Sequence, residues 1–313
     1  MDARNEPEAH NTEKPAGEPK FGIVALIGRP NAGKSTLLNR LLGQKVSIVS
    51  DKPQTTRNRI VGILNEPRGQ IALLDTPGIH KPLHRMNVRM MDHVRSAFAE
   101  ADVIAAIVDA TEDFGHGDQF VVDMLAGTET PRLLLLNKID RIKKHHLLPK
   151  LSMYNDLGHF RELVPISAET GDGVERLVDL LFEFLPEGPA RYPADDYTTQ
   201  PERFFAAEIV REKLLHHTRD ELPYTTAVAV DRWEEEESRN LLKIYATIVV
   251  ERDTQKKIVI GKGGSMIRTI GEEARKELES VLGTRIWLDL HVAVRELWRE
   301  DERFLGDLEW PLG

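Results

Sequence analysis

The residues best suited to chemistry form a glycine-rich segment between an apolar run, Ile23 to Ile27, and a helical stretch, Leu37 to Leu42. The segment has the spacing G-x-x-x-x-G-K-S, in which backbone N–H groups converge on phosphate oxygens at the N-terminus of the following helix. Its lysine can reach the β- and γ-phosphates of a nucleotide, and its serine hydroxyl can ligate Mg²⁺. The sequence therefore predicts a nucleotide-binding loop. The residues expected to hold the nucleotide are Gly28, Arg29, Pro30, Asn31, Ala32, Gly33, Lys34, Ser35 and Thr36.

A second segment, Asp75-Thr76-Pro77-Gly78, closes a run that is rich in β-forming residues. The carboxylate of Asp75 can hold Mg²⁺ through a water molecule, and the Gly78 N–H can bond the γ-phosphate. When the γ-phosphate leaves, that bond is lost and the loop can relax, which is the usual basis of a nucleotide switch. The loop and this segment together predict a nucleoside triphosphatase.

Two further segments identify the base. Asp140, in Asn137-Lys138-Ile139-Asp140, can accept hydrogen bonds from guanine N1–H and from the exocyclic amine, a donor pair that adenine lacks. Adenine would leave this carboxylate unpaired, so discrimination against it should be large. The stem of Lys138 can lie over the base, and Ser167-Ala168 can present a backbone N–H to guanine O6. Four segments in order, each at the carboxyl end of an expected strand, predict a guanine nucleotide as the ligand.

A threonine pair lies between these segments, in Pro53-Gln54-Thr55-Thr56-Arg57. A threonine hydroxyl here would complete the Mg²⁺ coordination only when the γ-phosphate is present. The two adjacent threonines leave the choice open: we favour Thr56, and the alternative is that either one caps a turn. The expected metal ligands are Ser35, Thr56 and Asp75.

The composition excludes several classes of protein. At 313 residues the chain is long enough for two domains, and no apolar run approaches the length that spans a bilayer. It contains no cysteine, which excludes disulfides and thiolate metal sites and favours a cytoplasmic location. Residues 1–20 are polar and rich in Glu and Pro, and are expected to form a disordered tail. Because the net charge is −9, any RNA contact must come from a local basic patch.

Short apolar strands alternate with amphipathic helices over residues 21–185. This alternation predicts an α/β fold in which a mostly parallel sheet carries helices on both faces. Together with the four nucleotide-binding segments, it predicts a P-loop GTPase domain. Pro186-Glu187-Gly188-Pro189 ends the last helix, so a linker is expected over residues 186–200. Residues 201–313 form the second domain, with an expected α-β-β-α-α-β order.

The second domain contains a glycine-rich turn of its own between two expected helices. Glycines let a nucleic-acid backbone approach closely, and a lysine in the turn adds positive charge at the contact. The turn alone is a weak signal, but within this order of elements it resembles the type II KH module, an α+β domain that clamps single-stranded nucleic acid. Apolar residues beside the turn could line a base-binding groove or belong to the core. The expected RNA-binding residues are Lys257, Ile260, Gly261, Lys262, Gly263, Gly264, Ile267 and Arg268.

Two other expectations concern this domain. Its first two strands should be joined by the acidic turn Glu234 to Glu237, which would repel phosphate and so point away from the RNA groove. Near the C-terminus, an apolar group is expected to pack on the sheet of the domain. Its members are Trp298, Phe304, Leu305 and Trp310.

The chain as a whole resembles the Era family of bacterial GTPases. The motifs that carry the resemblance are GRPNAGKST at Gly28–Thr36, PQTTR at Pro53–Arg57, DTPG at Asp75–Gly78 and NKID at Asn137–Asp140. The resemblance implies a GTP-hydrolysing switch, with GTP or GDP and Mg²⁺ as cofactors, that binds the 3′ end of small-subunit ribosomal RNA, most favourably with GTP, and assists assembly of the small ribosomal subunit. We expect a monomer in the cytoplasm; peripheral contact with the inner face of the cell membrane is an alternative that the family suggests.

Hydrolysis is expected to be slow without a partner or ion. The residue after the D-x-x-G motif is Ile79, where Ras-like switches carry a glutamine that orients the attacking water. His80 and Lys81 could substitute for it, although we favour their being ordinary solvated loop residues. Asn31 could hold a potassium ion near the developing phosphate charge, as in related GTPases, or simply stabilise the loop turn. The expected catalytic residues are Asn31, Lys34, Thr56 and Gly78.

Two other functions stay open at this point. One is an RNA-binding scaffold in which GTP is bound structurally and hardly hydrolysed, an alternative that Ile79 sustains. The other is a GTPase that acts on a membrane or cell-division partner, with RNA binding incidental.

Overall fold

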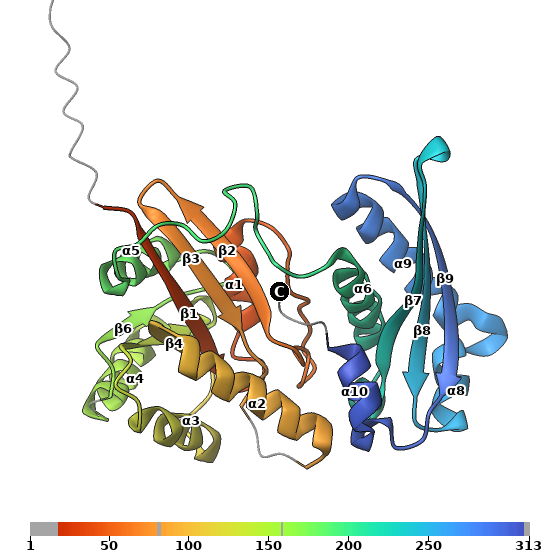
Figure 1. Cartoon of the computed structure of the whole chain (residues 1–313). Helices are drawn as coiled ribbons and strands as arrows, with labels where there is room; N and C mark the ends of the chain where they lie inside the picture. The colour runs from red at the N-terminus through yellow and green to blue at the C-terminus, as the bar shows by residue number, and fades with distance from the viewer. Residues whose placement is uncertain (1–17, 80–82, 158, 310–313) are drawn as a thin grey trace, which may run out of the picture.

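The computed structural model describes residues 18–79, 83–157 and 159–309, in which two separate sheets form (Figure 1). The first sheet has the strand order β2-β3-β1-β4-β5-β6, and within it β2 pairs antiparallel with β3 while the other pairs run parallel. The α/β fold predicted from the sequence is thereby confirmed. His80, Lys81, Trp310 and residues 1–17 of the expected tail lie outside the described residues. The strands are β1 (Lys20–Gly28), β2 (Ile60–Glu66), β3 (Gly69–Asp75), β4 (Val103–Asp109), β5 (Arg132–Asn137) and β6 (Glu162–Pro165).

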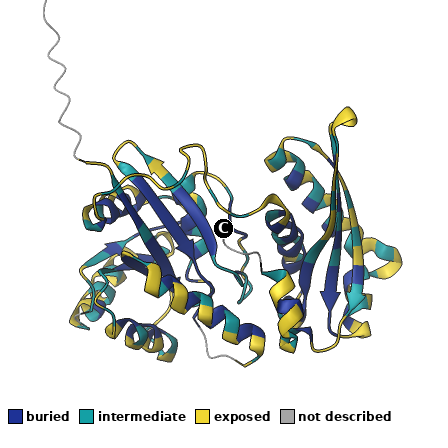
Figure 2. Cartoon of the chain, viewed as in Figure 1, coloured by how far each residue is buried: buried dark blue, intermediate teal, exposed yellow. Residues whose placement is uncertain are grey.

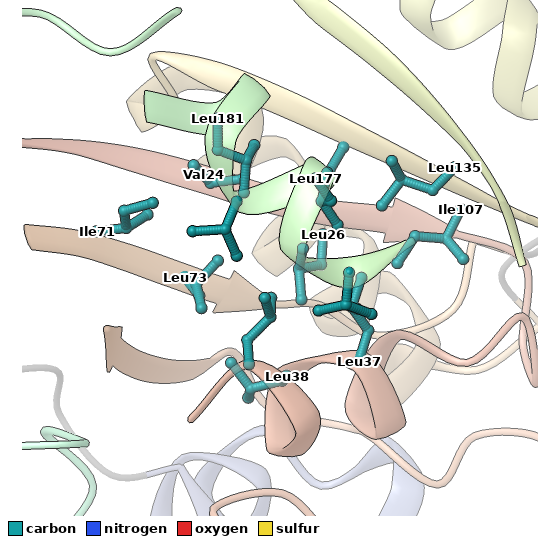
Figure 3. Close-up of a cluster of buried hydrophobic side chains, with 14 of the residues drawn as sticks. Val24, Leu26, Leu37, Leu38, Ile71, Leu73, Ile107, Leu135, Leu177 and Leu181 are labelled. Atoms are coloured by element: carbon teal, nitrogen blue, oxygen red, sulfur yellow. The ribbon is translucent and has the colours of Figure 1, made fainter. Parts of the chain in front are cut away.

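Both faces of this sheet are covered by helices, so its strands are buried along most of their length (Figure 2). Successive residues of β1 point to opposite faces. Val24 packs with Leu37 of α1 and Leu177 of α5 (Figure 3), whereas the next residue, Ala25, packs under α2, α3 and α4. None of the described helices is long and apolar enough to cross a membrane. The helices are α1 (Lys34–Leu42), α2 (Arg85–Glu100), α3 (His116–Ala126), α4 (Lys144–Asp156) and α5 (Val174–Phe184).

The second sheet has three strands in the order β7-β8-β9. β7 and β8 run antiparallel, and β8 and β9 run parallel, so the chain crosses from β8 to β9 through two helices. Apolar residues of these strands share one core with α6, α8 and α9. The order α-β-β-α-α-β is as predicted, with one additional short helix, α7, before β7. The elements are α6 (Glu202–His217), α7 (Leu222–Thr225), β7 (Ala227–Glu236), β8 (Leu241–Val250), α8 (Asp253–Ile260), α9 (Ser265–Leu282) and β9 (Arg285–Val294).

The acidic residues that were expected to form the turn between β7 and β8 lie largely in β7 itself, so that prediction is wrong. The turn consists of Glu237–Arg239 and Asn240, whose φ of 46° is in the left-handed region. A lysine explains the longer strand. Lys243 lies opposite Glu234 in register, and its ammonium group is 2.7 Å from the carboxylate of Glu236. Opposite charges on the paired strands offset the repulsion among the glutamates.

The C-terminal residues Trp298, Phe304 and Leu305 connect the two domains. As expected, they pack on β7 and β8, but they also share an apolar cluster with Met86 and Met90 of α2 in the first domain. Arg85 and Arg89 of α2 also form ion pairs with Glu302 of α10 (Glu302–Leu308) and with Glu309, the residue after it. The C-terminal segment is therefore part of the contact between the domains, beside α2 (Figure 1).

Loss of the buried indole in this cluster should destabilise the protein. Trp298 is 0% exposed, and its Nε1–H donates to the Thr225 carbonyl at 2.9 Å. We expect Trp298→Ala to lower the free energy of unfolding by about 3–5 kcal/mol, measured by urea unfolding followed by far-ultraviolet circular dichroism. The matched control is Trp287→Ala, because Trp287 is 45% exposed, and it should cost about 1 kcal/mol or less. Equal losses in the two variants would contradict the assignment of Trp298 to the core.

Candidate functional site

The predicted phosphate-binding segment forms a loop between β1 and α1, and its shape depends on glycine. Helix α1 begins directly after Gly33, whose φ of 102° lies in the left-handed region. A Cβ atom on Gly33 would lie 2.2 Å from Nδ2 of Asn137, and a Cβ atom on Gly78 would lie 2.6 Å from the backbone nitrogen of Pro30. A larger residue at either position would therefore displace the loop or its neighbours.

A cavity of about 430 Å³ opens beside this loop, within the size range of small-molecule pockets. Residues from all four predicted segments line it, together with residues of the segment 45–57 between α1 and β2, which we call the switch segment. Those of the predicted nucleotide-binding residues that line the cavity are Pro30, Asn31, Gly33, Lys34, Ser35, Thr36, Gly78, Asn137, Lys138, Asp140 and Ala168. Those outside the lining are Gly28, Arg29, Ala32, Asp75 and Ser167.

A buried carboxylate, that of Asp75, organises the hydroxyl groups at one end of the cavity. Asp75 is 0% exposed, and its Oδ2 accepts hydrogen bonds from Ser35 Oγ at 2.6 Å and from Ser47 Oγ at 2.9 Å. The Thr56 hydroxyl lies 2.9 Å from Ser35 Oγ. Burial raises the pKa of the Asp75 carboxyl, and the positive charge of Lys34 opposes this rise. Asp75 Oδ1 is buried and has no hydrogen-bond partner among the described residues, so this oxygen-rich group fits a Mg²⁺ ion.

The two adjacent threonines have different surroundings. The Thr55 hydroxyl donates to the carbonyl of Lys52 at 2.6 Å, within the switch segment itself. The Thr56 side chain is buried and faces Ser35 instead. The geometry therefore brings Thr56, the favoured residue, to the predicted metal ligands Ser35 and Asp75, whereas the Thr55 hydroxyl bonds within its own segment.

Lys34 is buried under the phosphate-binding loop. Its ammonium group donates to the backbone carbonyls of Arg29 at 3.0 Å and of Gly28 at 3.3 Å. Burial lowers the pKa of Lys34 to about 8, although the nearby Asp75 carboxylate favours the charged form. An anionic phosphate in the cavity would supply the charge that this buried cation lacks.

Asn137 joins the phosphate end of the cavity to the base end. Its Nδ2 donates to the Ala32 carbonyl at 2.8 Å, and its Oδ1 accepts from the Ala168 N–H at 2.9 Å. A backbone N–H of Ser167-Ala168 was expected to bond guanine O6; if it is that of Ala168, a bound base would share this donor with Asn137. The expected role of Asn137 in base binding is thus accompanied by a structural one, because it holds two loops together.

At the base end, Lys138 adopts a left-handed backbone conformation with φ of 65°. Its ammonium group lies 2.5 Å from the carboxylate of Asp109, at the end of β4. Although burial disfavours the charged form of Asp109, hydrogen bonds from Lys138 and Thr111 hold the pKa of its carboxyl below the usual range. This contact fixes the lysine stem along the cavity wall. The Asp140 carboxylate also lines the cavity, 3.7 Å from the guanidinium of Arg141.

Two residues proposed to influence hydrolysis occupy distinct positions. Asn31 has φ of 63°, and its Nδ2 donates to the Asp51 carbonyl at 2.8 Å, so its side chain joins the phosphate-binding loop to the switch segment. Ile79 is 4% exposed and packs in the core beneath α2. It therefore makes no polar contact with the cavity. The alternatives to it, His80 and Lys81, lie outside the described residues.

Sequence reasoning did not identify Ser47 or Asp109 as part of this site. Ser47 reaches Asp75 because Asn39 of α1 accepts hydrogen bonds from the backbone N–H groups of Val46 and Ser47 at 2.9 and 3.0 Å. No motif marks this contact. Asp109 does carry a signal, because it ends a buried strand at the edge where the other site residues lie.

The glycine-rich turn of the second domain projects between α8 and α9. Gly261, Gly263 and Gly264 all have φ between 60° and 79°. Lys262 is exposed, and a Cβ atom on Gly263 would find no other atom within 4 Å, so the turn is open to a ligand. Of the other predicted RNA-binding residues, Lys257 and Arg268 are exposed, whereas Ile260 and Ile267 are half-buried against the core of the domain.

Comparison with known proteins supports a two-domain organisation. A family model described as a 50S ribosome-binding GTPase matches residues 23–138, and a KH-domain model matches residues 221–299. The chain is 52% identical to the GTPase Era of Geobacter metallireducens, with 92% of this chain and 97% of the relative aligned. It is 49% identical to the GTPase Era of Heliobacterium modesticaldum, with 90% and 94% aligned.

Solved structures agree with these matches over both domains. An Era variant from Aquifex aeolicus bound to GDP·AlF4⁻ is 39% identical and superimposes with a TM-score of 0.89, covering 92% of this chain and 98% of that one. Era in complex with MgGDPNP and nucleotides 1506–1542 of 16S ribosomal RNA is also 39% identical, with a TM-score of 0.90 and coverage of 93% and 98%. The arrangement of the two domains is therefore shared with these nucleotide-bound relatives.

Substitution at the base end of the cavity should change nucleotide selectivity. In Asp140→Asn the side chain presents an amide instead of a second carboxylate oxygen, so we expect affinity for GTP and GDP to fall about 100-fold or more. Affinity for xanthosine diphosphate should rise, because the amide N–H can donate to the carbonyl that xanthine carries in place of the guanine amine. Fluorescent-nucleotide displacement measures both. Asp156→Asn, at an exposed position on α4, is the control, and unchanged guanine affinity in Asp140→Asn would exclude the assigned role.

Proposed function

The chain belongs to the Era family of GTPases, and we propose that it is a GTP-dependent switch that binds the 3′ region of small-subunit ribosomal RNA and assists assembly of the small ribosomal subunit. It is a GTP-hydrolysing enzyme with a C-terminal KH domain. The proposal is carried by the presence in one chain of a cavity suited to a guanine nucleotide and an open glycine turn flanked by cations. The related Era that was solved with MgGDPNP and a 16S ribosomal RNA segment supports the same pairing of ligands.

The RNA-binding part of the proposal rests on local charge and on access. Lys257, Lys262 and Arg268 are exposed around the glycine turn, in a chain whose net charge is −9. A single strand whose backbone passes over Gly263 would meet these cations, and its bases could contact the half-buried Ile260 and Ile267. The cations at this turn would attract the phosphates of a single RNA strand, although the net negative charge of the protein repels them elsewhere.

For hydrolysis we assign roles to the residues that surround the cavity. Ser35, Thr56 and Asp75 would hold Mg²⁺, which neutralises charge on the phosphates when it is bound. Lys34 would contact the β- and γ-phosphates, and the Gly78 N–H would donate to the γ-phosphate. Because Ile79 has no polar side-chain atom, no side chain at that position orients water, and unassisted turnover should be slow.

We also propose the context in which the protein acts. Residues 21–185 would form the GTPase domain, 186–200 the linker and 201–313 the RNA-binding domain. Because its proposed target is the small ribosomal subunit, we place its action in the cytoplasm, as a monomer. Peripheral contact with the inner face of the cell membrane stays the alternative that the family suggests.

Substitution in the glycine turn should abolish RNA binding and spare the nucleotide site. Gly263→Asp places a side chain and a negative charge in the open space that the RNA backbone would need. We expect affinity for the 3′-terminal segment of 16S ribosomal RNA to fall about 100-fold or more, with GDP affinity unchanged. Fluorescence anisotropy with the GDPNP-bound protein measures the first quantity.

The matched control is Gly283→Asp. Gly283 has φ of 65°, and a Cβ atom on it would find no other atom within 4 Å, so the same charge and the same backbone strain are introduced at the far end of α9. This variant should bind RNA within about twofold of the unsubstituted protein, because its charge lies outside the turn. If Gly263→Asp bound RNA as well as Gly283→Asp does, the turn would not be the RNA site.

A potassium ion is proposed to accelerate hydrolysis. The Asn31 side chain lies beside the Asp51 carbonyl, so an amide oxygen and a carbonyl oxygen are available near the phosphate end of the cavity. We expect single-turnover GTP hydrolysis to be about tenfold or more faster in KCl than in NaCl of equal ionic strength. Asn31→Gly, which tolerates the φ of 63°, should abolish that difference. Equal rates in the two salts would remove the ion from the mechanism.

A further inference from the structure

The switch segment lines the nucleotide cavity and also packs on the second domain. The Val49 N–H donates to Glu212 of α6 at 2.9 Å, and the Lys45 ammonium lies 2.6 Å from the same carboxylate. Ile48 is 2% exposed and belongs to the apolar core of the second domain. The chain between α1 and β2 is thus held by helix α6, which lies between this segment and the second sheet (Figure 1).

The residues on either side of Thr56 make the most direct of these contacts. The Thr55 carbonyl accepts a hydrogen bond from the Arg211 guanidinium of α6. The Arg57 guanidinium donates to the carbonyl of Thr226 at 2.6 Å and to that of Pro223 at 2.8 Å, where α7 leads into β7. Thr56 is therefore held by the second domain through the peptide before it and the side chain after it.

Both arginines are fixed in place by their surroundings. Arg211 is 2% exposed, and Glu208, one turn earlier in α6, accepts hydrogen bonds from its guanidinium at 2.6 and 2.7 Å. The Arg57 guanidinium lies over the ring of Trp298, 5.7 Å from the ring centroid. Buried guanidinium groups with such fixed partners hold the backbone that they contact in one position.

We propose that Arg57 and Arg211 are positioning residues for GTP hydrolysis, which hold the Thr56 hydroxyl toward Ser35 and Asp75, so that the second domain completes the Mg²⁺·GTP site. This inference rests on the role assigned above to Thr56 as a metal ligand. Neither arginine lines the nucleotide cavity itself; each acts through the backbone on either side of Thr56. The Mg²⁺·GTP site thereby depends on the second domain, which supplies Arg211 and anchors the side chain of Arg57.

The positioning role predicts a selective defect. The Thr56 hydroxyl contacts Ser35 of the phosphate-binding loop, but the base contacts at Asn137 and Asp140 and the backbone N–H groups of that loop do not include Thr56. We therefore expect GDP binding not to need the two arginines. The Mg²⁺·GTP complex does need Thr56, and a displacement of about 1 Å at a catalytic group can cost about 100-fold in rate. A merely structural role would instead lower the affinities for GTP and GDP together.

The experiment uses the full-length protein and measures three quantities in the absence of RNA. These are the single-turnover rate of GTP hydrolysis at saturating nucleotide, the Mg²⁺ concentration that gives half of this rate, and the dissociation constant of GDP. In Arg57→Met and Arg211→Met we expect the rate to fall about tenfold or more and the Mg²⁺ requirement to rise, with GDP affinity within about twofold. Arg57→Lys and Arg211→Lys should recover part of the rate, because lysine can still donate to one carbonyl.

The matched control is Arg59→Met. Arg59 lies two residues beyond Arg57, and its guanidinium pairs with Glu100 of α2 at 2.6 Å, within the first domain. This variant should hydrolyse GTP at the rate of the unsubstituted protein. Unchanged rates and Mg²⁺ requirements in the two Arg→Met variants, or equal losses of GTP and GDP affinity, would overturn the proposal. Because RNA is absent, failure of the unsubstituted protein to bind RNA would instead contradict the proposed function and leave this result standing.

Discussion

The nucleotide site depends on one constraint, the burial of the Asp75 carboxylate. A buried carboxylate is costly unless hydrogen bonds and opposite charges compensate it. Here two serine hydroxyls and the nearby Lys34 ammonium compensate part of the cost of burying Asp75. Its Oδ1 has no hydrogen-bond partner among the described residues. Ser35 of the phosphate-binding loop and Ser47 and Thr56 of the switch segment therefore bring their hydroxyl groups to the same point. The carboxylate thus explains both the fit to Mg²⁺ and the convergence of the loops around the cavity.

The switch segment extends this constraint to the second domain. One end of its contact network is the hydroxyl of Thr56 near Ser35, and the other is the pair of carbonyls that Arg57 contacts before β7. A movement at either end must be accommodated at the other, because the intervening peptide is bonded to α6 as well. Any free energy by which the terminal phosphate favours one position of Thr56 is therefore shared with the packing of the KH domain, and the coupling is reciprocal.

The sequence alone was sufficient to predict those features that depend on residues close together in the chain. The spacing of Gly28 to Ser35, the strand ends at Asp75 and Asn137, and the turn at Gly261 each depend on a few adjacent residues, and the α/β fold follows from alternating strands and helices. Contacts between segments distant in the sequence were not predictable. Ser47 meets Asp75, Arg57 meets Thr226, and Trp298 meets Met86 only because the folded domains bring them together. The acidic strand of β7 was missed for the same reason, since Lys243 compensates it from the neighbouring strand.

The burial of Ile79 gives these long-range contacts their importance for catalysis. With an apolar residue in the core where other GTPases place a water-orienting glutamine, hydrolysis must rely on fixed charges and dipoles around the phosphates. Such electrostatic stabilisation is effective only when the charged groups are held in place before the reaction, because reorganising them costs the energy that they would supply. The charged and polar groups around the phosphates lie on the phosphate-binding loop and on the switch segment. Helix α6 of the RNA-binding domain holds the switch segment through hydrogen bonds to Val49 and Thr55. An RNA that changes the packing of α6 would therefore act on hydrolysis through the position of Thr56, without contacting the nucleotide.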